Sequence, residues 1–388
     1  MVTTTSADNV LKSYYLSAVT DQLNKSINPF LAKIKQTASD VWGRDVRKTV
    51  RIGINGGIGA GTEEGTLPTP RGNRYAQFVA TLKNLYGTIE ITDKAIRASA
   101  SNEGAFINLL NDEMQSLVES ASCNFGRMLF GDGSGTLAVA TNVIGQGGNG
   151  IYTCTDTRNI IEGMCVDVWV GNARQVLNAQ VLAVDRVNKT VTLQGTPASV
   201  SAQNNGRLCV SGSKNLEITG LQAIFESDTL YGLTREGNAW LEPYKVDSVG
   251  DISENVIQTA IDEVEARTGS KINFIITTPG VRRALFNTLS QYRHIDTVEL
   301  EGGFKAISFN GIPIVTDRFC QKGTMYLLNT DDFGLHQLCD WQWLEGEDGK
   351  VLKQLADKPV FRATLVKYAE LMCYRPAGQA RLTDISEE

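Results

Sequence analysis

The sequence has few of the residues from which catalytic and metal sites are usually built. It contains only two histidines among 388 residues, His294 and His336, and neither belongs to an HExxH pattern. Its seven cysteines are scattered, odd in number and free of any CxxC pair, which argues against a disulfide framework and a zinc knuckle. We therefore expect reduced thiols in a protein made in a cytosol. The cysteines are Cys123, Cys154, Cys165, Cys209, Cys320, Cys339 and Cys373.

Targeting segments and strong charge are also missing. No apolar run approaches the ~18 residues that a membrane helix needs, so no membrane association is expected. The first ten residues, MVTTTSADNV, do not have the basic-then-apolar form of a signal peptide. With 37 basic and 43 acidic residues the net charge is −6, whereas tight nonspecific nucleic-acid binders need clustered Lys and Arg. Hydrophobic residues reach 42%, enough for a globular protein of two or three domains.

Two glycine-rich stretches resemble catalytic motifs but fail the test for each. The run Gly56–Gly61 does not match GxGxxG, and no Lys-Ser/Thr follows it as a P-loop requires. Ser134 stands between glycines, but Asp132 occupies the place of the first glycine of GxSxG. Glu63-Glu64 is interpreted as a solvated acidic tip or as an ion-pair partner of another subunit. The sequence thus predicts no enzyme, no catalytic residue, no cofactor-binding residue and no metal ligand.

The first 92 residues predict an arm and a long hairpin. Apolar residues at helical spacing between 10 and 23 predict a short helix, which packs on its own domain or on a neighbouring subunit. KTVRIGI alternates as a strand does, and RYAQFVATLKNLYGTIEI provides the returning strand. Between them lies NGGIGAGTEEGTLPTPRGN. A structureless stretch of this length inside a compact domain usually has its partner elsewhere.

Residues 101–130 give the clearest periodic signal. Apolar residues recur at steps of three and four from Phe106 to Leu129, with Ser101 as the candidate N-cap. Gly131-Asp132-Gly133 is typical of a helix end. A helix of this length is far longer than the usual ~11–12 residues.

Residues 151–212 read as short strands at ~8–12-residue spacing, which favours a small β-barrel or sandwich. Glycine-rich 145–150 and Ser211-Gly212-Ser213 border this block, so we predict an inserted domain.

Residues 250–340 read as α/β, and 341–388 end in a long strand. Asp251 and Glu254 fit a capping box for one helix, which Gly269 ends. Thr278 caps a second helix that begins with Pro279, and Asn310-Gly311 predicts a tight hairpin. Residues 359–374 form a single half-buried β segment.

This order of segments resembles the major capsid protein of tailed bacteriophages, an α+β protein of the Hong Kong 97-type fold. The resemblance covers essentially the whole chain and rests on RKTVRIGINGGIGAG, RYAQFVATLKNLYGTIEITDKAI, EGAFINLLNDEMQSLVESASCNFGRMLFGDGSG, NLEITGLQAIF, DTLYGLTREGNAW and FIITTPGVRRALFNTL. It implies an N-arm, an E-loop hairpin, a P-domain with a spine helix, an A-domain and an inserted β-barrel-like domain. The implied ranges are 1–47 for the N-arm, 48–92 for the E-loop, 93–136, 213–249 and 341–388 for the P-domain with spine helix 101–130, 151–212 for the insert, and 250–340 for the A-domain.

The resemblance also implies a function. Copies would form pentamers and hexamers and close an icosahedral shell around double-stranded DNA, after assembly in the host cytoplasm. The expected partners are further copies, portal and scaffold proteins and decoration proteins; no cofactor is implied. Some members cross-link covalently through an E-loop lysine, but residues 49–82 contain none, and only Lys48 and Lys83 flank them. No room exists for a scaffold domain ahead of the arm, so we expect scaffolding to be a separate protein.

Three alternatives remain open. An encapsulin-like nanocompartment shell shares the fold, although the β insert and chain length favour a virus. A carbohydrate-binding surface protein would act through residues 151–212. A hydrolase with an unrecognised Ser/His/Asp relay is the third. Separately, Trp341 and Trp343 could stack a sugar or a base.

Overall fold

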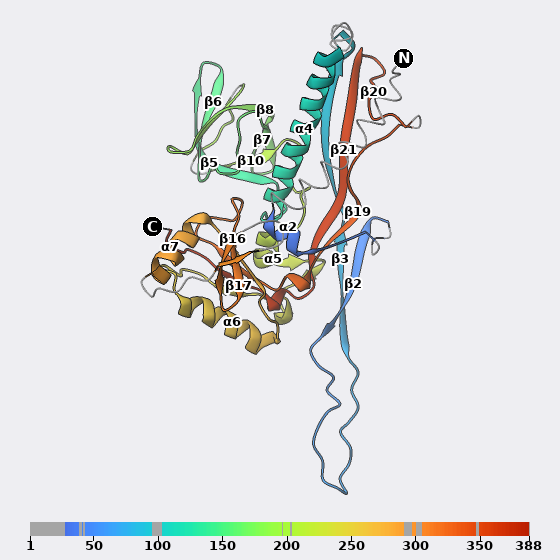
Figure 1. Ribbon diagram of the computed structural model, residues 1–388, viewed down its shortest axis with the longest axis vertical. Helices are drawn as coiled ribbons and strands as arrows, with labels where there is room; N and C mark the ends of the chain where they lie inside the picture. The colour runs from blue at the N-terminus through green and yellow to red at the C-terminus, as the bar shows by residue number, and fades with distance from the viewer. Residues whose placement is uncertain are drawn as a thin grey trace.

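The computed structural model describes residues 28–38, 41, 43–94, 103–195, 197–201, 204–290, 297–299, 305–346 and 349–387. The helix expected between 10 and 23, and with it most of the arm, lies outside these residues, as do Ser101 and His294. Figure 1 shows a body with three extensions: a rod built on a long helix, a projecting hairpin, and a barrel beside the rod.

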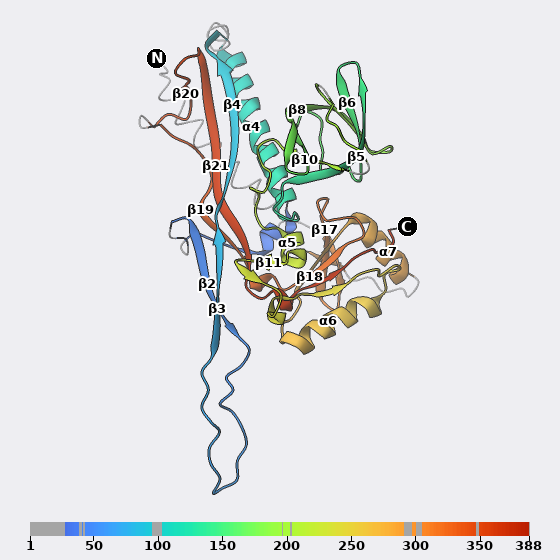
Figure 2. The same ribbon diagram turned by 180° about the vertical axis from the view of Figure 1, so that it is seen from behind.

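The rod consists of helix α4 laid along a twisted five-stranded sheet (Figure 2). The expected long helix is confirmed as α4, Glu103–Met128, and the long C-terminal strand as β21, Val360–Cys373. Gly87 lets the helix approach, because a Cβ there would meet the Leu117 side chain at 3.0 Å. The sheet order is β1 (Lys35–Thr37), β19 (Phe333–Trp343), β21 and β20 (Lys353–Gln354), with β4 (Lys83–Thr92) also paired to β21.

The predicted hairpin 48–92 is wrong at both ends. It runs from β2 (Asp45–Ile52) to β3 (Arg74–Thr81), and the returning strand ends before Leu82. The following strand, β4, pairs with β21 over its whole length. Its buried residues Leu85, Ile89 and Ile91 belong to the body core, and this burial accounts for the change of partner.

The insert is a closed six-stranded barrel, and its predicted start at residue 151 is wrong. Its first strand, β5, begins at Thr136, so the glycines at 145–150 are a hairpin turn inside the barrel. Gly147 and Gly148 both have positive φ, which a two-residue turn of this kind requires. The barrel order is β10 (Gly206–Val210), β5 (Thr136–Gln146), β6 (Asn149–Cys154), β9 (Thr190–Leu193), β8 (Ala173–Asp185) and β7 (Cys165–Val170).

The α/β unit does not coincide with 250–340. Its seven-stranded sheet also takes β13 and β22 from outside that range, whereas β19 belongs to the rod. Helix α6 (Glu254–Thr268) is capped by Ser253, not by Asp251, because the Ser253 side chain accepts from Val256 N. The sheet order is β13 (Tyr244–Val246), β22 (Ala380–Leu382), β18 (Met325–Leu328), β14 (Phe274–Thr277), β17 (Ile312–Thr316), β16 (Lys305–Phe309) and β15 (Thr297–Glu299).

Other local predictions are confirmed. Gly269 ends α6 in the left-handed conformation, and Thr278 Oγ1 accepts from Val281 N at the start of α7 (Pro279–Ser290). Asn310-Gly311 joins β16 to β17. The remaining elements are α2 (Pro29–Lys33), α5 (Leu221–Glu226), β11 (Thr229–Leu230), β12 (Leu233–Thr234) and the short helices η1 (Ala239–Leu241), η2 (Thr330–Asp332) and η3 (Pro376–Gly378).

Apolar side chains form three separate cores. The largest joins α4 to the rod sheet, the hairpin base and one face of the α/β sheet. A second fills the space between α6, α7 and the other face of that sheet. The third contains only barrel residues, from Leu137 to Leu208. The barrel is therefore a unit with its own core.

Candidate functional site

The projecting hairpin carries a group of exposed apolar side chains. Its strands pair over eight residues, and residues 53–73 then continue as an exposed loop without helix or strand. Three large apolar side chains of this tip are exposed: Ile54 by 80%, Ile58 by 74% and Leu67 by 89%. Burial of such a side chain contributes roughly 1.5–3 kcal/mol, so this loop suits contact with another surface.

The base of the hairpin is firmly held, in contrast to its tip. Phe78 is fully buried, with its ring stacked on Trp240 at 5.7 Å between centroids and tilted toward Tyr231 at 5.3 Å. Val79 N also donates to Tyr231 O at 3.0 Å. The hairpin thus leaves the body in a fixed direction.

The hairpin and the long helix carry opposite charge. The shaft exposes Arg47, Lys48, Arg51 and Arg74, and acidic Glu63-Glu64 lies in the exposed loop. The segment 103–126 of α4 has four acidic residues and no Lys or Arg, and its Glu113 and Glu119 are exposed. Two copies could therefore bring unlike charges together.

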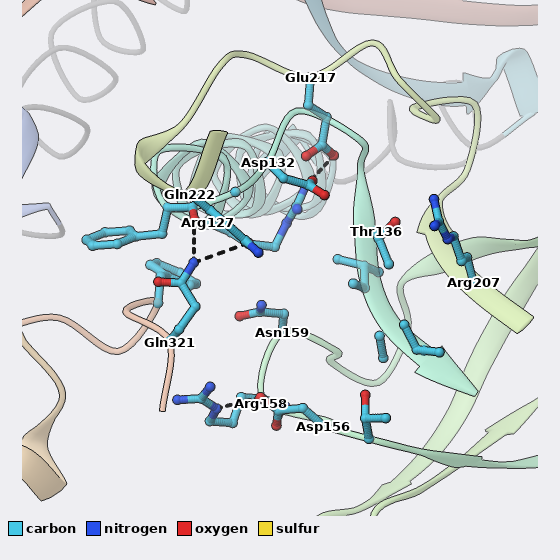
Figure 3. A pocket seen from close by; sticks show the side chains of 17 residues that line it. Arg127, Asp132, Thr136, Asp156, Arg158, Asn159, Arg207, Glu217, Gln222 and Gln321 are labelled. Atoms are coloured by element: carbon cyan, nitrogen blue, oxygen red, sulfur yellow. Dashed lines mark hydrogen bonds and ion pairs between the residues drawn. The ribbon is translucent and has the colours of Figure 1, made fainter. Parts of the chain in front are cut away.

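A polar cleft of about 430 Å³ separates the barrel from the body (Figure 3). At its inner end Arg127 of α4 forms a buried ion pair with Glu217, and Arg127 also donates to Asn124 Oδ1. Across the cleft, Arg158 donates to Asp156 Oδ2 at 2.8 Å and to the carbonyl oxygen of Cys320 at 3.1 Å. Two acidic and two basic groups of the lining are thus paired, Arg127 with Glu217 and Arg158 with Asp156.

The sequence candidates for chemistry do not form a catalytic site in the described residues. Gly56–Gly61 lies in the exposed loop and opens no helix. Ser134 Oγ is 2.8 Å from Thr136 Oγ1, a local turn contact, and Ser134 follows the end of α4. His336 is buried, with Nε2 2.9 Å from the hydroxyl of Tyr374.

The tryptophans considered for sugar stacking are packed among other side chains of the same chain. Trp341 and Trp343 are each only 5% exposed and belong to the body core. In the barrel, Lys214 Nζ lies 3.9 Å from the ring centroid of Trp169, and Tyr152 is buried with its hydroxyl accepting from Ala198 N. These are the only aromatic residues of 136–210, so the barrel offers little support for glycan binding.

The buried ionisable groups of the body with shifted pKa values include Glu370, Asp317 and Lys367. Burial raises the pKa of Glu370 to about 7, although Thr219 N donates to its Oε1 at 2.6 Å. Burial likewise raises the pKa of Asp317 to about 6. Burial lowers the pKa of Lys367, whose Nζ donates to Gln337 Oε1 at 2.9 Å and to Asp340 Oδ1 at 2.6 Å. Lys367 and Glu370 both lie on β21, whereas Asp317 follows the end of β17, and each acts as a structural contact.

Sequence reasoning missed these buried groups. Arg127 and Glu217 are 90 residues apart, and nothing local marks them as partners. Lys367 lies in β21, and the only local signal for burial there is the alternation of apolar residues along the strand. In the part of the chain that the structure describes, no cluster of His, Cys, Asp and Glu is suited to a metal ion. No described helix is long and apolar enough to cross a membrane.

Comparison with known proteins identifies the fold. No protein-family model matches the chain, and no curated protein matches it in sequence. The capsid asymmetric unit of cyanophage A-1(L) is 12% identical, covers 93% of each chain and has a TM-score of 0.55. An encapsulin complex from Synechococcus elongatus is 10% identical over 93% of this chain and 89% of that chain, with a TM-score of 0.49. The first likeness shows that the chain has the fold of a phage capsid protein, as the sequence resemblance predicted.

Proposed function

We propose that this chain is the major capsid protein of a tailed phage and that its copies assemble through pentamers and hexamers into an icosahedral shell around double-stranded DNA. The observation that carries the proposal is the projecting hairpin, whose apolar loop residues Ile54, Ile58 and Leu67 are exposed. A two-stranded hairpin is marginally stable alone, and this one becomes buried only against another copy. The capsid fold of the chain supports the same conclusion.

The proposal assigns roles to the parts of the molecule. Residues 45–81 serve as the E-loop, and the rod of α4, β4 and β21 as the P-domain. The α/β unit serves as the A-domain near the capsomer axis, and the barrel, 136–210, is the insert. Residues before Asp45 serve as the N-arm, of which α2 and β1 pack on the rod sheet of the same chain.

Charge complementarity supports contacts between copies. The basic hairpin shaft and the acidic segment 103–126 of α4 lie on different parts of the molecule (Figure 1), so one copy can place its hairpin near the helix of the next. Opposite charge of this kind favours encounter and orientation more than affinity. The role is structural and not enzymatic. Portal, scaffold and decoration proteins are the proposed partners, and the virion, assembled in the host cytoplasm, is the proposed location.

Assembly of the purified chain tests the proposal. Size-exclusion chromatography and electron cryo-microscopy should show capsomers, shells or tubes. As a matched control, residues 53–73 are replaced by an Asn-Gly turn between Ile52 and Arg74, which should retain the circular dichroism spectrum and abolish assembly. A wild-type chain that stays monomeric at every salt and protein concentration would contradict the proposal. Purified shells that contain cargo enzyme instead of DNA and portal would support the encapsulin alternative.

A further inference from the structure

The attachment of the barrel to the body is narrow. The chain enters the barrel through residues 131–135 and returns through 211–217, and Asn215 N donates to Ser134 O at 2.8 Å between the two crossings. All buried residues of the barrel core belong to the barrel itself. An interface between two units that lacks a shared apolar core normally permits relative motion.

We call the two chain segments that join the barrel to the body, 131–135 and 211–217, the neck. Buried carboxylates fix its two ends. On the barrel side, Asp167 accepts from Ser211 Oγ at 2.9 Å and from Gly212 N at 3.1 Å. On the body side, Glu217 pairs with Arg127 of α4. Both carboxylate side chains are about fully buried, at 1% and 2% exposure. Residues 132–135 and 213–216 remain between the two anchors.

A charged hydrogen bond spans the cleft beside the neck. Arg158 extends from the β6–β7 connection and donates to the carbonyl oxygen of Cys320, in the loop between β17 and β18. Asp156 holds the guanidinium from the other side, through Nε at 2.8 Å. The arginine side chain is 39% exposed, so water can solvate the guanidinium when its contact with Cys320 is broken.

We propose that the barrel is a latched module that pivots about residues 132–135 and 213–216, and that the Arg158 hydrogen bond to Cys320 holds it in the orientation seen here. The polar cleft provides the space for the movement (Figure 3). Few residues at the neck absorb the rotation, as in hinge motions generally. The barrel and the body each move as rigid units, because each keeps its own core.

Distance measurements on the full-length chain test the latch. Genetically encoded spin labels are placed at exposed Val187 in the barrel and exposed Ala266 in α6, so that the native cysteines stay unlabelled. Labelled chain is diluted into unlabelled chain to remove distances between copies. The wild type should give one narrow distance distribution. Arg158→Ala should raise the displaced population by about tenfold, the scale of one hydrogen bond to a charged group.

Two further variants make the result decisive. Arg186→Ala removes another exposed barrel arginine, which pairs with Glu162, and should leave the distribution unchanged. Arg158→Lys keeps the positive charge but loses the planar guanidinium, so it should give an intermediate displaced population. This variant also tests the latch if Arg158→Ala folds poorly. Identical narrow distributions for all variants would show a rigid neck and overturn the proposal. A broad distribution in the wild type would equally contradict a latch.

Discussion

The barrel and the hairpin are both antiparallel β-structure, but only the barrel has a core made of its own residues, whereas the buried residues of the hairpin base belong to the body core. The barrel strands close on themselves, so inward residues such as Val168 and Leu208 are fully buried and no strand edge is left open. The hairpin ends in a loop whose apolar residues lie in water. The difference indicates that the barrel carries its stability within itself, whereas the apolar side chains of the hairpin tip are not buried by their own chain.

Deletion at the observed boundaries should have the largest effect on this comparison. Removing 136–210 and joining Gly135 to Ser211 takes out a whole closed unit, so the body should stay soluble and keep its α4 helix. Removing 151–212 instead takes out β10 and most of β6, the two strands that pair with β5, and so exposes an open strand edge. We expect that variant to aggregate, as judged by solubility and circular dichroism. Equal solubility of the two variants would contradict the barrel boundary.

Truncation of single apolar residues should separate the two regions by several kcal/mol. Leu208→Ala empties a fully buried position and should cost about 2–5 kcal/mol of barrel stability. Ile58→Ala, at an exposed position, should change the stability of the unassembled chain by less than about 0.5 kcal/mol. Denaturant melts of the unassembled chain measure both. A large loss from Ile58→Ala would mean that the loop packs on its own chain.

Titration of Glu370 should change the stability of the folded chain, because Glu370 accepts a hydrogen bond from Thr219 N in the segment that leaves the barrel. The hairpin, described in full from 45 to 81, has no comparable buried carboxylate. The pKa of Glu370 rises from 4.5 to about 7 on folding, so the folded chain holds the proton more tightly. The stabilisation is complete below pH 4.5 and is lost as the pH rises through about 7, which corresponds to about 3 kcal/mol. Glu370→Gln, a neutral mimic, should flatten the loss between about pH 4.5 and 7.

The control for this titration is Glu119→Gln, at an exposed position on α4. It should leave the pH profile of the melting temperature unchanged. In Glu370→Gln, a smaller slope near pH 6 should remain, because burial also raises the pKa of Asp317. Coincident profiles for Glu370→Gln and the wild type would show that Glu370 is ionised in the folded chain throughout.

The smallest expected effect concerns covalent bonding of the hairpin. Because residues 49–82 contain no lysine, the contacts of the hairpin should be noncovalent. Assembled particles, boiled in denaturant and run on a gel, should give one band near 42.3 kDa. A ladder of covalent oligomers would refute this.

Local signals in the sequence predicted local structure well. The period of α4, the left-handed Gly269 and the Asn310-Gly311 turn each depend on residues within a few positions of one another. The Gly147-Gly148 turn belonged to the same class and could have been recognised as a hairpin signal. Interpreting these glycines as a linker leaves the first strand of the barrel, β5, outside the predicted insert.

Pairing between distant segments was beyond local reasoning. The alternation of β4 is the same whether it pairs with β3 or with β21, and only the buried face shared with α4 selects β21. The same holds for Arg127 with Glu217 and for the buried Lys367. The capsid fold was predictable mainly from the order of segments along the chain.

The position of β22 has a consequence for the time course of folding. This strand, Ala380–Leu382, lies inside the seven-stranded sheet between β13 and β18, not at its edge. Until residue 382 has been synthesised, β13 has no partner strand and β18 lacks one of its two neighbours. Contacts this distant in sequence form slowly, so a nascent or truncated chain cannot present a finished α/β unit. A chain that ends before residue 382 therefore carries an α/β sheet with one strand missing from its interior.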